Sequence, residues 1–486
     1  MMVLGMCSVV GAEETSGTSE ADTGKITIDN AIVGQTYTIY RILELESFSD
    51  KTTKPNTGNY AYKAVKEWED FITKGEGEEY LKIEDGYVYW KGDNNDARAA
   101  ELAKKALVYA NKNKIKQSKE PVEAKSAKVE FTDLPLGYYL VDSSTGALCS
   151  LNTTDKDVTI EEKNAAPTVK KKVQEDSKIN TEDEYGESNT ADLGQTVNFQ
   201  TTITAQPGAQ NYVLHDRMSE GLTFDKIDSV KVGDTPLAVN KDYVTESEST
   251  GDGCTFHITF TPTYCESIKT ETIITVTYSA TLNKGATIAG DGNKNETWLK
   301  YGENSQTTHE TTTTKTYEIP VFKYTKKGAD KKALEGAEFE LYRDEKCTSE
   351  NQIKFIKTGT NNTSKYDCYR IAIDSETSSV GKITTSADGK FKISGLDADT
   401  YYLKEVTAPK GYNKLASPLK IEITSDGKIK VNNGDEKEAT NPVEVENNTG
   451  SILPSTGGMG TTLFYIFGAI LVIGSGVVLI TKKRMK

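Results

Sequence analysis

Histidine is scarce in this chain of 486 residues, which contains only three: His215, His257 and His309. They are scattered along the sequence, and we recognise no cysteine or carboxylate beside them at the spacing of a metal-ligand motif or a catalytic triad. The sequence therefore predicts no metal site, no cofactor and no histidine-dependent catalysis.

Positive charge is also in short supply, because 58 lysines and arginines face 72 aspartates and glutamates, which leaves a net charge of −14. Nucleic acids bind to clustered Lys and Arg, so they are excluded as partners. No phosphate-binding loop and no paired carboxylates of a catalytic cleft stand out. Hydrophobic residues make up 36% of the chain, enough for it to fold, and its length allows about three domains.

Cysteine is similarly infrequent, with six residues in the chain. Cys254 and Cys265 flank one predicted hairpin, and Cys347 and Cys368 flank another stretch. In an exported chain each pair could form a disulfide, and the alternative is buried thiols. The sequence leaves both alternatives open.

Long hydrophobic runs are missing except near the two ends of the sequence. Residues 1–12 are apolar and finish with small residues, as a partial signal peptide does. Residues 463–480 form an uncharged, mostly apolar run that is just long enough to cross a bilayer as a transmembrane helix. Residues 482–486 are mostly basic, and positive charge stays on the cytoplasmic side.

Most of the remaining chain alternates Thr, Val, Ile and Tyr with polar residues, in short runs separated by Gly, Asn and Asp. Residues 197–203 and 273–278 are examples. This period of two predicts a mainly β protein made of tandem immunoglobulin-like sandwiches in an elongated array. The exception is residues 94–110, where Ala and Leu recur at helical spacing and predict one helix inserted between strands.

Changes in composition predict domains at residues 25–164, 167–310 and 317–450. The predicted joints are a Pro-containing break at residues 164–167 and a Thr-rich linker at residues 307–316.

A weak internal repeat connects the first and third domains. Residues 134–142 and 396–405 both contain Tyr-Tyr-Leu followed by an acid, with one residue inserted in the second segment. This alignment places Asp142 opposite Glu405 and predicts the same type of sandwich for both domains.

A pentapeptide stands immediately before the C-terminal apolar run: Leu453, Pro454, Ser455, Thr456 and Gly457. Pentapeptide, apolar span and basic tail, in this order over residues 453–486, resemble the cell-wall sorting signal of Gram-positive surface proteins. The resemblance implies that a sortase attacks the carbonyl of Thr456, releases the chain from Gly457 onward and passes the acyl group to an amine. It also implies a secreted protein that is covalently anchored to the cell wall.

The third domain contains three runs that closely resemble the collagen-adhesin B-type (Cna-B) domain of pilins: residues 319–324, 402–412 and 443–448. In that family a first-strand Lys joins a last-strand Asn in an intramolecular isopeptide bond, and an acidic residue catalyses the step. The resemblance implies that Lys323, Glu405 and Asn447 form this set, with Asn448 as the fallback for Asn447.

Burial explains how such residues can react. It disfavours the charged form of a lysine and so supplies a neutral amine that can attack. It also keeps a carboxylic acid protonated, so that the acid can donate to the carbonyl of the amide. The fold supplies the proximity.

The middle domain resembles isopeptide-forming pilin domains of the Cna-A or Cna-B type, with Asp in place of Glu. The resemblance implies a second set of Lys171, Asp216 and Asn295. The choice of Lys171 over Lys170 and Lys172 depends on strand alternation, because a slip of one residue would reverse which lysine points inward. The resemblance implies no cross-link in the first domain.

A shaft-forming pilin also needs an exposed nucleophilic lysine near the end of its first domain, which the family often writes as Tyr-Pro-Lys-Asn. Lys163 is the nearest match, because the Lys-Asn pair is kept and the Tyr-Pro pair is not. Lys170, Lys171 and Lys172 are its competitors for this role.

The resemblance covers nearly all of the chain and predicts the backbone subunit of a sortase-assembled pilus, a structural protein rather than an enzyme. The implied partners are a sortase, other copies of the chain, accessory pilins and a peptidoglycan precursor at the pilus base. The alternative is a monomeric wall-anchored adhesin or accessory pilin that binds host matrix or a host cell-surface ligand.

Overall fold

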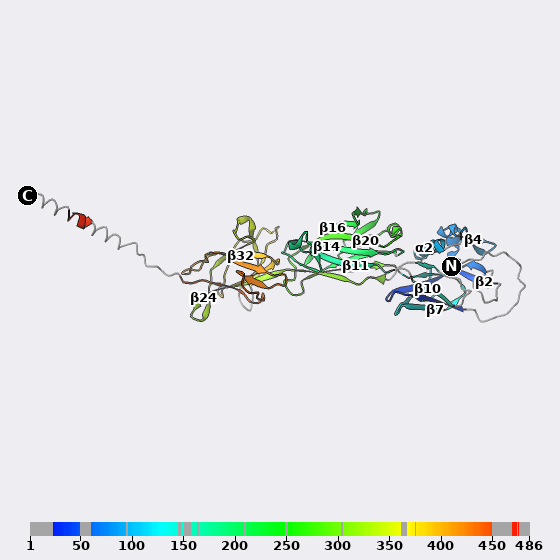
Figure 1. The fold of residues 1–486 in the computed structure, drawn as a ribbon, viewed down its shortest axis with the longest axis horizontal. Helices are drawn as coiled ribbons and strands as arrows, with labels where there is room; N and C mark the ends of the chain where they lie inside the picture. Colours follow the sequence, from blue (N-terminus) through cyan, green and yellow to red (C-terminus); the bar gives the residue numbers. More distant parts are fainter. Residues whose placement is uncertain are drawn as a thin grey trace, which may run out of the picture.

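The computed structural model extends along one axis, with three β-rich parts in a row (Figure 1). It describes residues 23–48, 60–93, 96–143, 147–149, 157–162, 165–208, 210–247, 251–302, 305–360, 367–374, 376–449, 469–473 and 475. We call the three parts the N-terminal sandwich (β1 to β10), the middle sandwich (β11 to β23) and the C-terminal sandwich (β24 to β35).

The N-terminal sandwich has one sheet in the order β10-β1-β7, a second in the order β3-β2-β8-β9 with β6 beside β2, and the hairpin β4-β5. Its elements are β1 (Thr23–Asp29), β2 (Thr36–Phe48), β3 (Tyr60–Ala64), α1 (Glu69–Thr73), β4 (Leu81–Glu84), β5 (Tyr87–Trp90), α2 (Asp96–Asn113), β6 (Val122–Glu123), β7 (Lys128–Pro135), β8 (Gly137–Asp142), β9 (Ala147–Cys149) and β10 (Asp157–Glu161).

The middle sandwich packs a sheet of order β12-β11-β14-β20-β16-β17 on a sheet of order β13-β23-β21-β15-β19-β18, with β22 beside β21. Its elements are β11 (Thr168–Gln174), β12 (Tyr185–Gly186), β13 (Ser188–Thr190), β14 (Thr196–Ala205), β15 (Val213–Met218), β16 (Leu222–Val232), β17 (Thr235–Pro236), β18 (Tyr243–Glu246), β19 (Phe256–Phe260), α3 (Pro262–Ser267), β20 (Thr272–Leu282), β21 (Asn293–Tyr301), β22 (Ser305–Gln306) and β23 (Glu310–Lys315).

The C-terminal sandwich packs a sheet of order β25-β24-β31-β29-β28, with β35 beside β24, on a sheet of order β27-β26-β32-β33-β34, with β30 beside β26. Its elements are β24 (Tyr317–Lys327), β25 (Asp330–Ala333), β26 (Glu338–Tyr342), β27 (Gln352–Ile353), β28 (Phe355–Thr360), β29 (Asp367–Ile371), β30 (Ile383–Thr384), β31 (Lys390–Leu396), β32 (Thr400–Thr407), β33 (Leu419–Ile423), β34 (Ile429–Val431) and β35 (Val443–Glu446).

Alternation along the strands creates the cores, as predicted. In β14, for example, Val197, Phe199, Thr201 and Ile203 are buried, while the residues that alternate with them are more exposed. Because successive side chains of a strand point to opposite faces, each sheet offers one apolar face to its partner. The prediction of a mainly β protein with few helices is confirmed.

The predicted inserted helix is α2, which lies beside the N-terminal sandwich and both begins and ends a few residues later than expected. Its face at Leu102, Ala106 and Leu107 is buried against a cluster that also contains Trp68 and Phe71. The helix therefore covers the outer face of the sheet that contains β8.

The predicted Thr-rich linker at residues 307–316 is largely a strand, and this prediction was wrong. Residues Glu310–Lys315 form β23, which pairs antiparallel with β21 and parallel with β13. Thr312 and Thr314 are fully buried, because the β-branched threonines alternate as strand residues do. Only Thr316 separates β23 from β24, so one nearly continuous strand runs from the middle sandwich into the C-terminal sandwich.

The predicted repeat is present, but its alignment shifts by one residue. Tyr139 Oη donates to the carbonyl of Pro135 at 2.6 Å, and Tyr401 Oη donates to the carbonyl of Asp397 at 3.1 Å. These equivalent bonds, each four residues back, make Tyr139 the counterpart of Tyr401 without an insertion. The residue equivalent to Glu405 is therefore the buried Ser143 rather than Asp142.

The middle and C-terminal sandwiches meet in a polar contact around Asp192. Its carboxylate accepts from the backbone N–H of Asp397 at 2.9 Å and lies 2.6 Å from the Arg343 guanidinium. Leu193 donates its N–H to the carbonyl of Gly395 at 3.0 Å. Together with the continuous strand, these bonds restrain the angle between the two sandwiches.

The predicted signal segment (residues 1–12) and sorting pentapeptide (residues 453–457) lie outside the described residues, as does most of the predicted span 463–480. Within the part of the chain that is described, no helix is both long and apolar enough to cross a membrane.

A substitution in β23 distinguishes a strand from a linker. We expect Thr314→Asp to lower the free energy of unfolding of the middle sandwich by about 3 kcal/mol, because it places a charge in a dry sheet interface. Calorimetric unfolding measures the loss. Thr311→Asp, at an exposed position of the same strand, is the control and should change stability little. Equal, small effects at both positions would contradict the strand.

The contact between the sandwiches should respond to pH. Burial, together with the nearby Asp192 and Asp176 carboxylates, raises the pKa of Asp397 to about 7. A raised folded-state pKa contributes stability that is full below about pH 4 and is lost as the pH rises through 7, at up to about 1.4 kcal/mol per pH unit. We expect Asp397→Asn to remove this decline in unfolding midpoints measured from pH 5 to 8, whereas the exposed Asp399→Asn retains it.

Candidate functional site

Three polar residues are buried together in the C-terminal sandwich: Lys323 on β24, Glu405 on β32 and Asn447 just after β35. Strands β24 and β35 pair in parallel, and Lys323 is in register with Val445. Strand β32 belongs to the facing sheet, so alternation points Glu405 at the other two residues. The three predicted residues are therefore brought together between the sheets.

The contacts within this cluster are close. Lys323 Nζ donates to Asn447 Oδ1 and lies 3.2 Å from Glu405 Oε1. Asn447 Nδ2 donates to the same Oε1 at 2.8 Å, and the N–H of Leu415 donates to Glu405 Oε2 at 2.8 Å. Burial lowers the pKa of Lys323, against the opposing effect of the Glu405 carboxylate. Lowering the pKa favours the neutral amine that nucleophilic attack requires.

Two details of this cluster bear on the sequence interpretation. Glu405 contacts the amide nitrogen of Asn447, whereas we expected it at the carbonyl oxygen. The fallback Asn448 is exposed, while Asn447 is 1% exposed. Proximity to Lys323 therefore selects Asn447 over Asn448.

The middle sandwich contains a second buried cluster with Lys171 on β11, Asp216 on β15 and Asn295 on β21. Lys171 Nζ lies 2.7 Å from Asp216 Oδ2. Lys170 and Lys172 are exposed, so the strand register agrees with the choice of Lys171. All three predicted residues again face the interior between two sheets.

Tyr278 on β20 is a member of this cluster that the sequence analysis missed. Its hydroxyl donates to Asp216 Oδ2 at 2.5 Å, accepts from Lys171 Nζ, and accepts from Asn295 Nδ2 at 3.4 Å. Alternation along residues 273–278 predicts an inward tyrosine, but nothing in the sequence indicates which interior position it shares. Burial raises the pKa of Asp216 and lowers that of Lys171.

The predicted acceptor Lys163 lies outside the described residues, as do Thr456 and the rest of the pentapeptide. Among its competitors, Lys171 is 4% exposed and occupied in the cluster just described, so it is not accessible to an enzyme. Lys170 and Lys172 remain exposed on β11.

The four cysteines with predicted partners are thiols in this structure, so it contains neither predicted disulfide. Cys254 precedes β19 and Cys265 follows it, and the five-residue strand between them separates their backbones by roughly 17 Å, far beyond disulfide reach. Cys368 lies on β29 of one sheet, whereas Cys347 follows β26 of the facing sheet. Strand geometry therefore keeps the first pair apart, and the second pair is unbonded.

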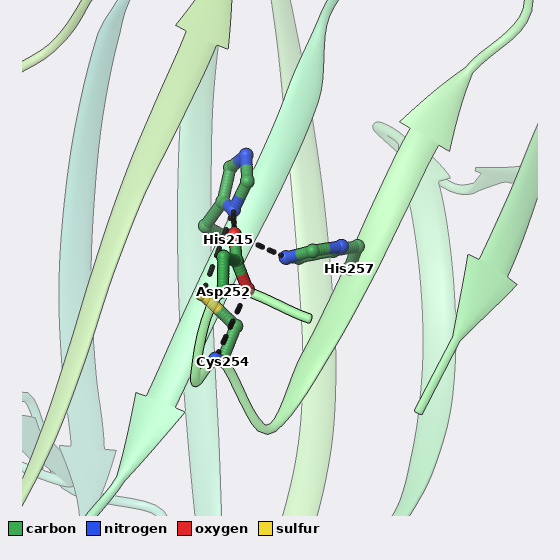
Figure 2. Close-up of side chains that lie close together, drawn as sticks. All are labelled: His215, Asp252, Cys254 and His257. Atoms are coloured by element: carbon green, nitrogen blue, oxygen red, sulfur yellow. Dashed lines mark hydrogen bonds and ion pairs between the residues drawn. The ribbon is translucent and has the colours of Figure 1, made fainter. Parts of the chain in front are cut away.

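A third cluster of polar side chains was not recognised in the sequence analysis, which predicted no metal site. Ligand-type atoms of His215, Asp252, Cys254 and His257 all lie within 4.8 Å of one another (Figure 2). Pairing of β15 with β19 makes His215 and His257 cross-strand neighbours. Cys254 stands three residues before His257, which is a spacing that could have been recognised; the contribution of His215 depends on the fold.

Comparisons with known families agree with this architecture. Residues 204–305 match the model of the Gram-positive pilin backbone subunit 2, Cna-B-like domain. Residues 320–437 match the SpaA prealbumin-like fold domain, and residues 446–486 match the LPXTG cell wall anchor motif.

The chain is also similar to individual proteins. A fimbrial subunit type 1 of Actinomyces viscosus is 29% identical over 167 residues, which is 32% of this chain and 30% of that protein. The T6 backbone pilin of serotype M6 Streptococcus pyogenes has a similar fold, with a TM-score of 0.50 and 18% identity over 84% of this chain and 81% of that one. The major pilin SpaD of Corynebacterium diphtheriae aligns with a TM-score of 0.48 and 19% identity, over 89% of this chain and 99% of that one.

The matched segments make the middle and C-terminal sandwiches similar to domains of Gram-positive pilin backbone proteins, which are structural proteins rather than enzymes. With its LPXTG anchor motif, the chain is a cell-wall-anchored surface protein of a Gram-positive bacterium.

Proposed function

We propose that this protein is the backbone subunit of a covalently polymerised pilus, stabilised inside each subunit by lysine–asparagine isopeptide bonds. The observation that carries the proposal is the buried contact of Lys323, Glu405 and Asn447 at the parallel pair β24 and β35. The matches of the chain to pilin backbone and anchor models support it.

The reaction at this cluster forms one bond and releases ammonia. Neutral Lys323 Nζ attacks Cγ of Asn447, and the C–N bond to Nδ2 breaks. Glu405 touches both nitrogens, so it can take the proton that Nζ loses and deliver one to the departing Nδ2. The attack is intramolecular, and the two sheets hold the reacting groups in position. The reaction therefore avoids the entropy cost of bringing two separate molecules together.

The middle cluster is proposed to react in the same way, with Asp216 as the proton carrier. Here the hydroxyl of Tyr278 contacts Lys171, Asp216 and Asn295. Tyr278 would therefore position the lysine and the amide around the carboxyl. The ring of Tyr278 stacks on that of Phe199 with 5.4 Å between the ring centroids, and this stacking holds the hydroxyl in place.

Such bonds suit a subunit that is pulled from both ends. Lys323 and Asn447 are 124 residues apart, and a covalent link between them prevents β24 and β35 from separating. Closing a loop of this length removes about 4–5 kcal/mol of chain entropy from the unfolded state, by analogy with a disulfide.

Polymerisation is proposed to join Thr456 of one subunit to a lysine of the next, with a sortase as catalyst. Lys163 is the proposed acceptor, because Lys171 is buried in the middle cluster; Lys170 and Lys172 are the exposed competitors. The remaining proposed partners are accessory pilins, a peptidoglycan precursor at the base and a host matrix or cell-surface ligand.

Mass spectrometry tests the internal bonds. We expect recombinant residues 167–450 to weigh less than their sequence by two molecules of ammonia, and a peptide joining Lys323 to Asn447 to appear after digestion. Glu405→Gln removes the proton carrier of the C-terminal cluster, so its bond should not form and the measured mass should rise by one ammonia. Asp216→Asn should have the same effect on the middle cluster.

The matched control is Lys170→Arg, beside the buried lysine, which should keep both losses. Tyr278→Phe should slow the middle reaction without affecting the C-terminal one. A mass equal to the plain sequence would eliminate both bonds.

Polymer formation is tested in cells that express the chain with its sortase. We expect a ladder of multimers that resists SDS, and we expect Lys163→Ala to abolish it because the acyl group of Thr456 then lacks its amine. Lys170→Ala and Lys172→Ala serve as controls, and loss of the ladder in either one would move the acceptor to that residue. A single band at monomer mass from the unaltered chain would instead favour a monomeric wall-anchored adhesin.

A further inference from the structure

We propose that His215, Asp252, Cys254 and His257 form a binding site for one Zn²⁺ ion on the outer face of the middle sandwich. The site is independent of the isopeptide clusters, since His215 and Asp216 are neighbours on β15 whose side chains leave opposite faces of the sheet.

Three of the distances between the candidate ligand atoms match those around a tetrahedral ion, and all of them are within 4.8 Å. His215 Nδ1 lies 3.2 Å from Asp252 Oδ2 and 3.5 Å from Cys254 Sγ, and His257 Nε2 lies 3.2 Å from the same Oδ2. Zinc bonds of about 2.1 Å at tetrahedral angles separate neighbouring ligand atoms by about 3.4 Å. The four side chains converge on one point, as Figure 2 shows.

The fold builds the site from two strands and one loop. His215 on β15 and His257 on β19 are directly opposite each other in the antiparallel ladder. Asp252 and Cys254 come from the loop before β19, and the backbone N–H of Cys254 donates to Asp252 Oδ1 at 3.1 Å. Gly251 and Gly253 have φ of 76° and 79°, a region that favours glycine and lets the loop turn both side chains toward the histidines.

The surroundings of the two histidines resemble those of metal ligands. His257 Nε2 is buried and faces the cluster, and although Asp252 Oδ2 lies 3.2 Å away, no well-aligned hydrogen bond satisfies this nitrogen. Its other nitrogen, Nδ1, lies 3.8 Å from the carboxylate of Glu246, the neighbour of His257 on β18. A carboxylate behind a ligating histidine orients the ring. The His215 ring is held by stacking on Trp298 at 5.1 Å.

The donor set selects the class of metal. Two imidazole nitrogens, one thiolate and one carboxylate suit Zn²⁺, whereas Ca²⁺ and Mg²⁺ require oxygen ligands. Because the protein supplies all four ligands, the site is of the closed, structural kind. Bound zinc would tie the loop before β19 to β15, the strand that also carries Asp216.

The test uses the full-length chain, purified reduced and metal-free. We expect isothermal titration to show one Zn²⁺ bound per chain. We also expect Co²⁺ in its place to give the charge-transfer absorption of a cobalt–thiolate bond, which reports a thiolate ligand that the Cys254→Ser variant then assigns. A raised unfolding temperature of the middle sandwich should accompany zinc.

Cys254→Ser should abolish the thiolate band and lower zinc affinity by at least about 100-fold, and Glu246→Gln should lower it by about 10-fold. Cys368→Ser and His309→Gln, whose side chains lie outside the cluster, are the controls and should bind zinc like the parent. Circular dichroism verifies that each variant is folded. Absence of stoichiometric zinc binding, or binding that Cys254→Ser leaves unchanged, would overturn the site and reduce the cluster to polar packing.

Discussion

The parallel pairing of β24 with β35 is the constraint on which the C-terminal sandwich depends. It places the fully buried Lys323 beside Asn447 and under Glu405 of the facing sheet. A buried amine and carboxylate are expensive to keep as a charged pair. Conversion to an amide, with loss of ammonia, would relieve that cost by removing the lysine charge, so the arrangement makes physical sense as a reactive site.

The middle sandwich also holds a buried lysine and a buried carboxylate beside an asparagine, but on different strands. Asn295 lies on β21, which is followed by β22 and β23, so the cluster does not join the first strand to the last one. Strand β23 runs through Thr316 directly into β24, and β23 pairs with the strand that carries Asn295. Tension applied to the C-terminal sandwich would therefore pass through the β23–β21 ladder to the middle cluster.

Strand alternation gives the two faces of one sheet separate chemistry. On β15, Asp216 points into the sandwich toward Lys171, while His215 points outward to Trp298 and the loop of Asp252 and Cys254. The inner cluster is dry and shielded between sheets. The outer cluster is open to solvent on the side of Asp252, so an ion can enter without disturbing the core.

Sequence alone determined the mainly β class and the inserted helix, because alternation and helical spacing are short-range properties. The Lys, acid and Asn of both inner clusters were implied by the resemblance of local motifs to a known family. The sequence also determined the anchor motif. Register and strand pairing could not be read from the sequence. The pairing shows that residues 310–315 form a strand, and the register shows that Ser143, rather than Asp142, is the N-terminal sandwich's equivalent of Glu405.

Tertiary structure also added Tyr278 to the middle cluster, kept Cys254 away from Cys265, and brought His215 to His257 across β15 and β19. The physical reason is common to all of these. A sheet joins residues that are distant in the chain through backbone hydrogen bonds, and those bonds carry no signature of their partner in the sequence.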